Sequence, residues 1–284
     1  MSSHPRTIAV LGAGTMGHGI AHAAAAAGYD THLYDVSEGQ LGKARDQIQA
    51  IVEKGVSLGK TGADEARALV GRLHPTTSVA DAVRHAAVVI EAVPERMDLK
   101  VGLLADVQVG APSEAVIASN TSALSLTELA AVLDRPGRLG GMHFFNPVHR
   151  MKLVEIVRAL ETSDETVRVM TELAVAMGKD TVLVKESPGF TTSRINAMIG
   201  NEAFFMLQEG VASARDIDKA LKLGLNHPMG PFELVDLVGL DTRLSILQHL
   251  HRTLGEKFRP CPLLEQFVRA GRLGRKVGRG VYEY

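Results

Sequence analysis

The chain has 284 residues, enough for two domains that each bury a hydrophobic core. Apolar residues make up 45% of it and the formal net charge is −1, so no excess of basic charge points to nucleic acid or an anionic membrane. The single cysteine, Cys261, has no partner for an internal disulfide or a zinc site. No apolar run approaches the roughly 20 residues of a membrane span, and no secretory signal is recognisable. We therefore expect a cytoplasmic protein without a nucleic-acid partner, a membrane partner or a metal.

Strand and helix patterns alternate through the first two-thirds of the chain. Short apolar runs indicate buried strands, and capping residues such as Ser37 and Gly28 bound the intervening helices. The predicted strands are 8–11, 31–34, 87–90, 115–119 and 139–144, and the predicted helices are 16–27, 37–54 and 64–71. This alternation predicts an α/β fold of the Rossmann type, with a doubly wound and mostly parallel sheet.

The order of elements changes after residue 144. The run 153–157 follows the strand 139–144 after a link too short for a helical crossover, so we expect an antiparallel pair at the edge of the sheet. A helix over 164–177 and a strand over 181–184 come next. Beyond Ser187-Pro188-Gly189 the pattern is helical, over 195–207, 214–223, 231–237, 241–254 and 262–270. We predict a Rossmann domain over 1–186 and an all-α C-terminal domain over 187–284.

The turn Gly12-Ala13-Gly14-Thr15-Met16-Gly17 lies between a predicted strand and a predicted helix. Its glycines permit a tight turn, a close approach of pyrophosphate to the backbone, and close packing of helix on strand. Free N–H groups and the helix dipole then face the phosphates. Asp35 follows the first glycine by 35 − 12 = 23 residues, where a carboxylate accepts hydrogen bonds from the adenosine ribose and repels a 2′-phosphate. We predict NAD as the cofactor, with a flavin as the alternative.

Two histidines follow the glycine turn. His18 and His22 have the i, i+4 spacing of a metal-binding pair, but no acidic third ligand is evident nearby. Their alanine and glycine neighbours indicate tight helix packing. We interpret both side chains as structural or adjacent to the cofactor.

Several motifs resemble those of the L-3-hydroxyacyl-CoA dehydrogenase family, which includes 3-hydroxybutyryl-CoA dehydrogenases. The motifs occur in order over nearly the whole chain. They are Ser119-Asn120-Thr121-Ser122, Met142-His143-Phe144-Phe145-Asn146-Pro147, Met151-Lys152-Leu153-Val154-Glu155, Ser187-Pro188-Gly189-Phe190, His227-Pro228-Met229-Gly230-Pro231 and Gly274-Arg275-Lys276 with Gly278, Gly280 and Tyr282.

The resemblance implies that His143 and Glu155 form the acid–base pair. The residues support this role independently, because a hairpin centred near residue 149 places 143 opposite 155 on one face. A carboxylate that accepts from one imidazole nitrogen fixes the tautomer. Neutral His143 would take the C3 hydroxyl proton while the hydride goes to the nicotinamide. A purely structural pair is the alternative.

The resemblance also implies roles for residues around this pair. Ser122 and Asn146 match residues that contact the substrate oxygen or position the histidine, with a turn or helix cap as the alternative for Ser122. Cofactor contacts are implied for Glu95, Lys100 and Asn120. The alternative for the first two is exposed charge.

Further substrate contacts are implied at three positions. Lys54 and Lys60 match a region that approaches the CoA 3′-phosphate, although solvated lysines are nearly as good an interpretation. Ser193 stands where many members of the family carry an asparagine. Because serine has a shorter reach than an amide, this departure bears on substrate positioning.

The resemblance implies the oxidation of a short-chain (S)-3-hydroxyacyl-CoA, such as 3-hydroxybutyryl-CoA, to the 3-oxoacyl-CoA with NAD. It also implies that the C-terminal domain forms a homodimer. Two alternatives stay open on the sequence. One is a dehydrogenase of a free hydroxy acid or sugar acid, such as gulonate, on the same scaffold. The other is a non-catalytic NAD-binding protein with a structural or sensor role.

Overall fold

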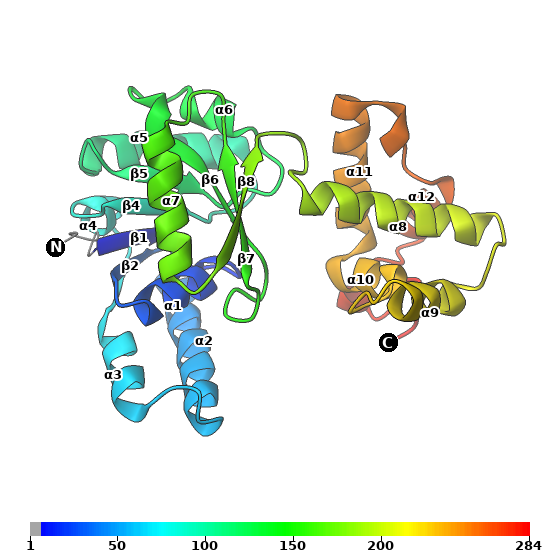
Figure 1. Ribbon diagram of the computed structural model, residues 1–284, viewed down its shortest axis with the longest axis horizontal. Helices are drawn as coiled ribbons and strands as arrows, with labels where there is room; N and C mark the ends of the chain where they lie inside the picture. Colours follow the sequence, from blue (N-terminus) through cyan, green and yellow to red (C-terminus); the bar gives the residue numbers. More distant parts are fainter. Residues whose placement is uncertain (1–6) are drawn as a thin grey trace. The chain divides into compact units, whose positions relative to one another are not determined.

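The computed structural model describes residues 7–284 and divides into two compact units, Met1–Glu186 and Ser187–Tyr284. The first unit contains the sheet and the second is helical (Figure 1). Among the described residues, no helix is both long and apolar enough to span a bilayer.

The first unit is built on an eight-stranded sheet in the order β3-β2-β1-β4-β5-β6-β7-β8. Every neighbouring pair is parallel except β6 with β7, so β7 and β8 run against the other six strands. The predicted doubly wound sheet with an antiparallel pair is confirmed. The strands are β1 (Thr7–Leu11), β2 (Asp30–Tyr34), β3 (Leu73–Thr76), β4 (Val88–Glu91), β5 (Val116–Ser119), β6 (Leu139–Phe144), β7 (Leu153–Arg158) and β8 (Asp180–Lys185).

Helices cover the sheet because its central strands are apolar on both sides. α7 lies across one face, and α2 and α3 extend away from the sheet as a pair (Figure 1). As predicted, Ser37 caps α2 by accepting from the Gln40 N–H at 3.3 Å, and Gly28 follows α1 with a φ of +93°. The helices are α1 (Gly17–Ala26), α2 (Glu38–Ser57), α3 (Ala63–Gly71), α4 (Val79–Val83), α5 (Met97–Gly110), α6 (Leu126–Ala130) and α7 (Asp164–Ala176).

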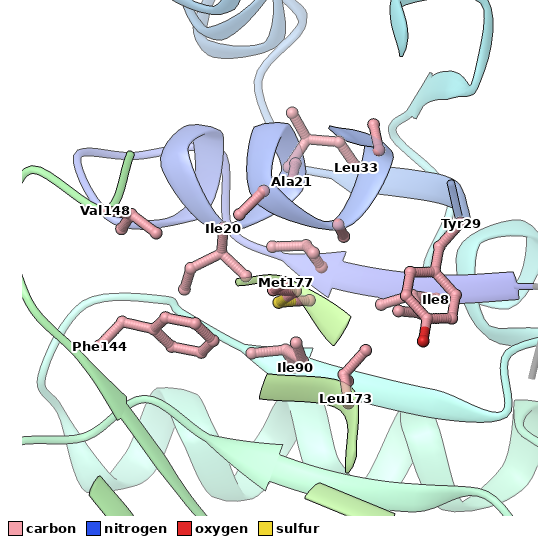
Figure 2. Packing of buried hydrophobic residues seen from close by; sticks show 14 of the residues in the cluster. Ile8, Ile20, Ala21, Tyr29, Leu33, Ile90, Phe144, Val148, Leu173 and Met177 are labelled. Carbon is pink, nitrogen blue, oxygen red and sulfur yellow. The ribbon is translucent and has the colours of Figure 1, made fainter. Parts of the chain in front are cut away.

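The core of the first unit joins α1, α7 and the strands between them. Ile8 of β1 and Ile90 of β4 meet Ile20 of α1 and Leu173 of α7 (Figure 2). Alanines 23–25 are also buried, which lets α1 approach the sheet closely. This packing fixes the start of α1, and therefore the glycine turn, against the end of β1.

Four elements of this unit lie outside the set that the sequence predicted: the short helices α4 and α6, the strand β3 and the helix α5. β3 contains a proline and polar side chains, and it is the partly exposed edge of the sheet, where proline is tolerated. α5 carries apolar side chains on more than one side and buries Lys100 with Leu104 and Val107. Neither segment therefore shows the simple periodicity of an amphipathic strand or helix.

The second unit is helical, as predicted. Its core contains Phe204 and Phe232, whose rings meet edge to face with centroids 5.1 Å apart. Residues 274–283 form two short bridges, and Asp236 anchors them by accepting from the N–H groups of Val281 and Tyr282 at 2.8 and 2.9 Å. The helices are α8 (Thr192–Gln208), α9 (Ala214–Gly224), α10 (Pro231–Val238), α11 (Leu240–Leu254) and α12 (Pro262–Arg269).

Candidate active site

Most of the predicted site residues of the first unit gather at one edge of the sheet. β1, β4, β5 and β6 are parallel, so their carboxyl ends meet there. The glycine turn follows β1, residues 120–122 follow β5, and His143 lies near the end of β6. Ligands bind at this edge in open α/β sheets.

The glycine turn has no room for side chains at its first and third glycines. Gly12 has a φ of +103°, and a Cβ there would lie 2.7 Å from the carbonyl oxygen of Ala92. A Cβ on Gly17 would lie 1.6 Å from the Gly12 carbonyl oxygen. Gly14 is different, because a Cβ there would meet nothing within 4 Å. The turn thus leaves its backbone open at Gly14, where a pyrophosphate would approach.

Asp35, at the end of β2, holds this turn from the side. Its two carboxylate oxygens accept from the N–H groups of Ala13 and Ser37 at 2.9 and 3.1 Å. Gln40, which the sequence did not single out, donates from Nε2 to the Ala13 carbonyl at 3.0 Å. The side chain of Gln40, in α2, therefore helps to shape the glycine turn, because it binds a residue 27 positions earlier in the chain.

A pocket of about 720 Å³ opens beside the turn. The walls of this pocket are largely apolar, which suits an adenine ring, and Asp35 lies among them, where its carboxylate can accept from the ribose hydroxyls. These features and the open backbone at Gly14 fit NAD. The lining residues include Gly12, Gly14, Thr15, Met16, Tyr34, Asp35, Val36, Ala92, Val93, Pro94, Leu99 and Leu103.

His143 and Glu155 face each other across β6 and β7. The two residues are partners in the strand register, as the sequence predicted, and Nδ1 of His143 lies 2.6 Å from Oε2 of Glu155. His143 is 7% exposed and Glu155 is fully buried. Because a buried carboxylate needs a hydrogen-bond donor or a cation, the pair accounts for a charge within an apolar strand. It also directs the imidazole Nδ1 toward the carboxylate.

Glu95 organises the loop that carries Ser122. Its Oε1 accepts from the Thr121 hydroxyl at 2.6 Å and from the N–H groups of Ser122 and Ala123 at 2.9 and 3.1 Å. Burial acts to raise the pKa of the Glu95 carboxyl, but these donors and the Lys100 ammonium outweigh it and hold the pKa below its ordinary value. Glu95 is therefore a charged anchor for the loop.

Lys100 is buried beneath this loop, in an ion pair that the sequence did not reveal. Its Nζ lies 2.6 Å from Oε1 of Glu91 and 3.5 Å from Oε2 of Glu95, and it is 1% exposed. Ser119 donates from its hydroxyl to Glu91 at 2.5 Å. The sequence feature that could have indicated this ion pair is Glu91 itself, a charged residue at the end of an otherwise apolar strand. The alternative interpretation of Lys100 as exposed charge is wrong, because its side chain is buried and paired with Glu91.

The remaining candidates are spread more widely. Asn120 accepts from the Phe144 N–H at 2.9 Å and so ties the end of β5 to the strand of His143. Asn146 is exposed, three residues after His143. Lys54 and Lys60 are exposed at the end of α2 and just beyond it, and neither lines the pocket beside the glycine turn. Ser193 lies in the first turn of α8 in the second unit.

The two histidines of α1 have separate environments. His18 places Nδ1 2.9 Å from the Gly14 carbonyl oxygen. Nδ1 of His22 is buried without a hydrogen-bond partner, and burial is the first cause that lowers its pKa to about 4. Within residues 7–284, no group of three or more potential ligands is arranged to hold a metal.

A doubly wound sheet, an open glycine turn with an acidic residue beside it, and a histidine–carboxylate pair at the same edge define an NAD-dependent oxidoreductase. Residues 7–187 match the family model described as 3-hydroxyacyl-CoA dehydrogenase, NAD binding domain, and residues 189–284 match the one described as its C-terminal domain. The chain belongs to the 3-hydroxyacyl-CoA dehydrogenase family. The predicted family, enzyme class and cofactor are confirmed.

Two curated relatives and one solved structure match this chain over nearly their full length. The chain is 45% identical to a probable 3-hydroxybutyryl-CoA dehydrogenase of Bacillus subtilis, over 98% of this chain and 97% of that protein. It is 42% identical to the 3-hydroxybutyryl-CoA dehydrogenase of Bradyrhizobium diazoefficiens, over 100% and 97%. The crystal structure of an (S)-3-hydroxybutyryl-CoA dehydrogenase from Ralstonia eutropha has a TM-score of 0.96 at 42% identity, over 98% of this chain and 99% of that one.

Proposed function

We propose that this protein oxidises a short-chain (S)-3-hydroxyacyl-CoA, such as 3-hydroxybutyryl-CoA, to the 3-oxoacyl-CoA. The balanced reaction is (S)-3-hydroxyacyl-CoA + NAD⁺ ⇌ 3-oxoacyl-CoA + NADH + H⁺. The observation that carries the proposal is the buried pair His143–Glu155, at the same edge of the sheet as the glycine turn. The names of the relatives support the choice of a short acyl chain.

His143 is the proposed acid–base catalyst. Its Nδ1 faces Glu155, so Nε2 is the nitrogen that takes the C3 hydroxyl proton during oxidation. The carboxylate of Glu155 then stabilises the imidazolium ion. In the reverse direction, the imidazolium returns the proton to the substrate oxygen. Bound NAD⁺ supplies the hydride acceptor for this chemistry.

Neighbouring residues are proposed to orient the substrate. Ser122 would hydrogen-bond the substrate oxygen, and its loop is held by Glu95, which supports a fixed position for the hydroxyl. Asn146 and Ser193 would contribute further hydrogen bonds. Lys54 and Lys60 are exposed and positively charged, which supports contact with the CoA 3′-phosphate.

The cofactor is proposed to bind beside the glycine turn. Gly12, Gly14 and Gly17 would present the backbone to its pyrophosphate at the start of α1, with Thr15 and Met16 at the rim. Asp35 would accept from the adenosine ribose. Glu95, Asn120 and Lys100 are proposed to support the nicotinamide side, with Lys100 acting through Glu95.

A spectrophotometric assay tests the function. We expect NADH to be consumed with acetoacetyl-CoA and formed with (S)-3-hydroxybutyryl-CoA, and no turnover with 3-hydroxybutyrate or gulonate. Oxidation of a free acid without turnover of the CoA esters would contradict the proposal. Wild-type turnover that His143→Gln does not reduce would contradict the role of the pair.

We also propose a homodimer formed through residues 187–284. Several large apolar side chains of this unit are exposed, among them Leu223 at 76% and Leu225 at 66%, at the end of α9. Such a cluster is typical of a surface that another protein covers. The buried and single Cys261 is compatible with the reducing cytoplasm, where we propose that the protein works.

A further inference from the structure

One wall of the pocket beside the glycine turn is formed by the helix α5. Leu99, Leu103 and Asp106 all line this pocket. Their spacing of four and three residues places the three side chains on one side of the helix. This side of α5 therefore presents two apolar side chains followed by a carboxylate.

Asp106 lies at the end of this wall that is farther from the glycine turn. The carbonyl oxygen of Ala92 would be 2.7 Å from a Cβ on Gly12, and α5 begins soon after it, at Met97. The helix connects the parallel strands β4 and β5, so it runs back from the edge of the sheet at which the turn lies. Along the helix axis, Asp106 is about 10 Å beyond Leu99.

The carboxylate of Asp106 is available to a ligand. It is exposed, and no hydrogen bond or ion pair within residues 7–284 includes its side chain. Asp35, the other acidic residue among those that line the pocket, is held at the glycine turn by the Ala13 N–H, and Gln40 donates to the Ala13 carbonyl. Burial is the first cause that raises the pKa of the Tyr34 phenol, and the charges of Asp35 and Asp106 raise it further, so both carboxylates lie near its hydroxyl.

We propose that Asp106 accepts a hydrogen bond from the 6-amino group of the cofactor's adenine, and so selects a 6-aminopurine over a 6-oxopurine. Adenine is flat and largely apolar, which suits Leu99 and Leu103, and in a nucleoside its 6-amino group is its N–H donor. A carboxylate accepts from that amine but repels the carbonyl oxygen that hypoxanthine carries at the same position. The inference rests on the proposed cofactor site, in which Asp35 accepts from the ribose at the opposite end of the nucleoside.

The binding of two reduced dinucleotides tests the inference. NADH and its deamino form, in which hypoxanthine replaces adenine, are titrated into the full-length protein, and each Kd is measured by nicotinamide fluorescence. For the wild type, we expect the deamino form to bind about tenfold more weakly or worse. Asp106→Asn supplies an amide that can donate to the 6-oxo group. In this variant the deamino form should bind more tightly than it binds the wild type, and the ratio of the two Kd values should fall to about one.

Asp98→Asn is the matched control. It removes the same charge from the first turn of α5, where Asp98 is paired with Arg96 and does not line the pocket, so the ratio of Kd values should stay at its wild-type value. A wild-type ratio near one, or an equal weakening of both dinucleotides in Asp106→Asn, would overturn the inference. If acetoacetyl-CoA is still reduced with NADH, such a result leaves the proposed function intact. A wild type that does not bind NADH would contradict the proposed function itself.

Discussion

At the scale of single residues, a buried carboxylate decides which nitrogen of His143 carries a proton. Glu155 lies 2.6 Å from Nδ1, and no solvent reaches its side chain. An ionised Glu155 requires a proton on Nδ1, so neutral His143 presents Nε2 as the basic nitrogen. The pair thereby combines the choice of tautomer with stabilisation of the imidazolium.

Glu155→Gln should reduce catalysis, through the tautomer and the imidazolium ion of His143, without weakening the binding of NADH. The amide keeps the size of the side chain but removes its charge, so we expect kcat to fall about 10²–10⁴-fold while KM for NADH changes little. His143→Gln should lose at least as much. Steady-state kinetics with acetoacetyl-CoA measure both variants. Near-normal kcat in Glu155→Gln would refute an electrostatic role for this carboxylate.

His22 gives the stability of the protein a pH dependence. Burial lowers its pKa in the folded protein to about 4, against 6.5 for an ordinary histidine, and His149, Lys179 and His18 lower it further by charge repulsion. The unfolded chain therefore binds a proton below pH 6.5 that the folded chain refuses down to pH 4. Folding stability should fall as pH drops through this window, by about 3 kcal/mol at most.

The measurement is urea unfolding at several pH values between 7 and 4.5 for the wild type and His22→Leu. Leucine cannot be protonated, so the variant should lose less stability than the wild type on acidification. Parallel stability curves for the two proteins would show that His22 does not contribute.

At the scale of elements, the glycine turn joins a strand, a helix and the cofactor pocket. Gly17 is part of the packing of α1 on β1, whereas Gly14 faces open space. The two glycines, three residues apart, should therefore respond to the same substitution in different ways.

Gly17→Ala should destabilise the fold and Gly14→Ala should not. In the first variant the methyl group would overlap the Gly12 carbonyl oxygen, at a cost of about 3 kcal/mol or more. In the second, the methyl group would obstruct the approach of pyrophosphate, so we expect an unchanged Tm and at least about tenfold weaker NADH binding. Thermal unfolding and NADH fluorescence titration check the pair. Tight NADH binding by Gly14→Ala would argue against a pyrophosphate at this glycine.

The helices and strands that the sequence predicted are those with a regular pattern of apolar residues. β1, β4 and β5 each contain a run of at least three apolar residues and were predicted within one or two residues, because a strand buried on both faces has a plain sequence signature. β3 and α5 were not predicted, since a proline-containing edge strand and a helix that buries a lysine lack that signature. These two segments form a regular strand and helix because other elements of the fold pack against them.

At the scale of the whole molecule, the chain divides into two compact units, the first of which ends at Glu186. The first contains the glycine turn and the His143–Glu155 pair. The second contains the buried Arg243 and exposed leucines near the end of α9. The proposed homodimer assigns those leucines to an interface between copies of the chain.

Light scattering coupled to size-exclusion chromatography tests this assembly. We expect a mass of about twice the 30.4 kDa of the chain. Leu223→Glu with Leu225→Glu should shift the protein toward the monomer, because charges would be buried in an apolar interface. Exposed Leu160, in the first unit, serves as the control when changed to Glu. A monomeric wild type would contradict the homodimer.

The sequence by itself determined the features that depend on neighbours along the chain. Turn glycines, the alternation of strands and helices, and the hairpin that sets His143 opposite Glu155 all follow from short-range spacing. Tertiary structure decided which charges are buried and which groups balance them. Glu91 at the end of β4 meets Lys100 because α5 turns back over that end, and Arg243 of α11 is buried where Gly200 of α8 lies against it. Burial depends on every element that covers a residue, so local sequence carries little record of it.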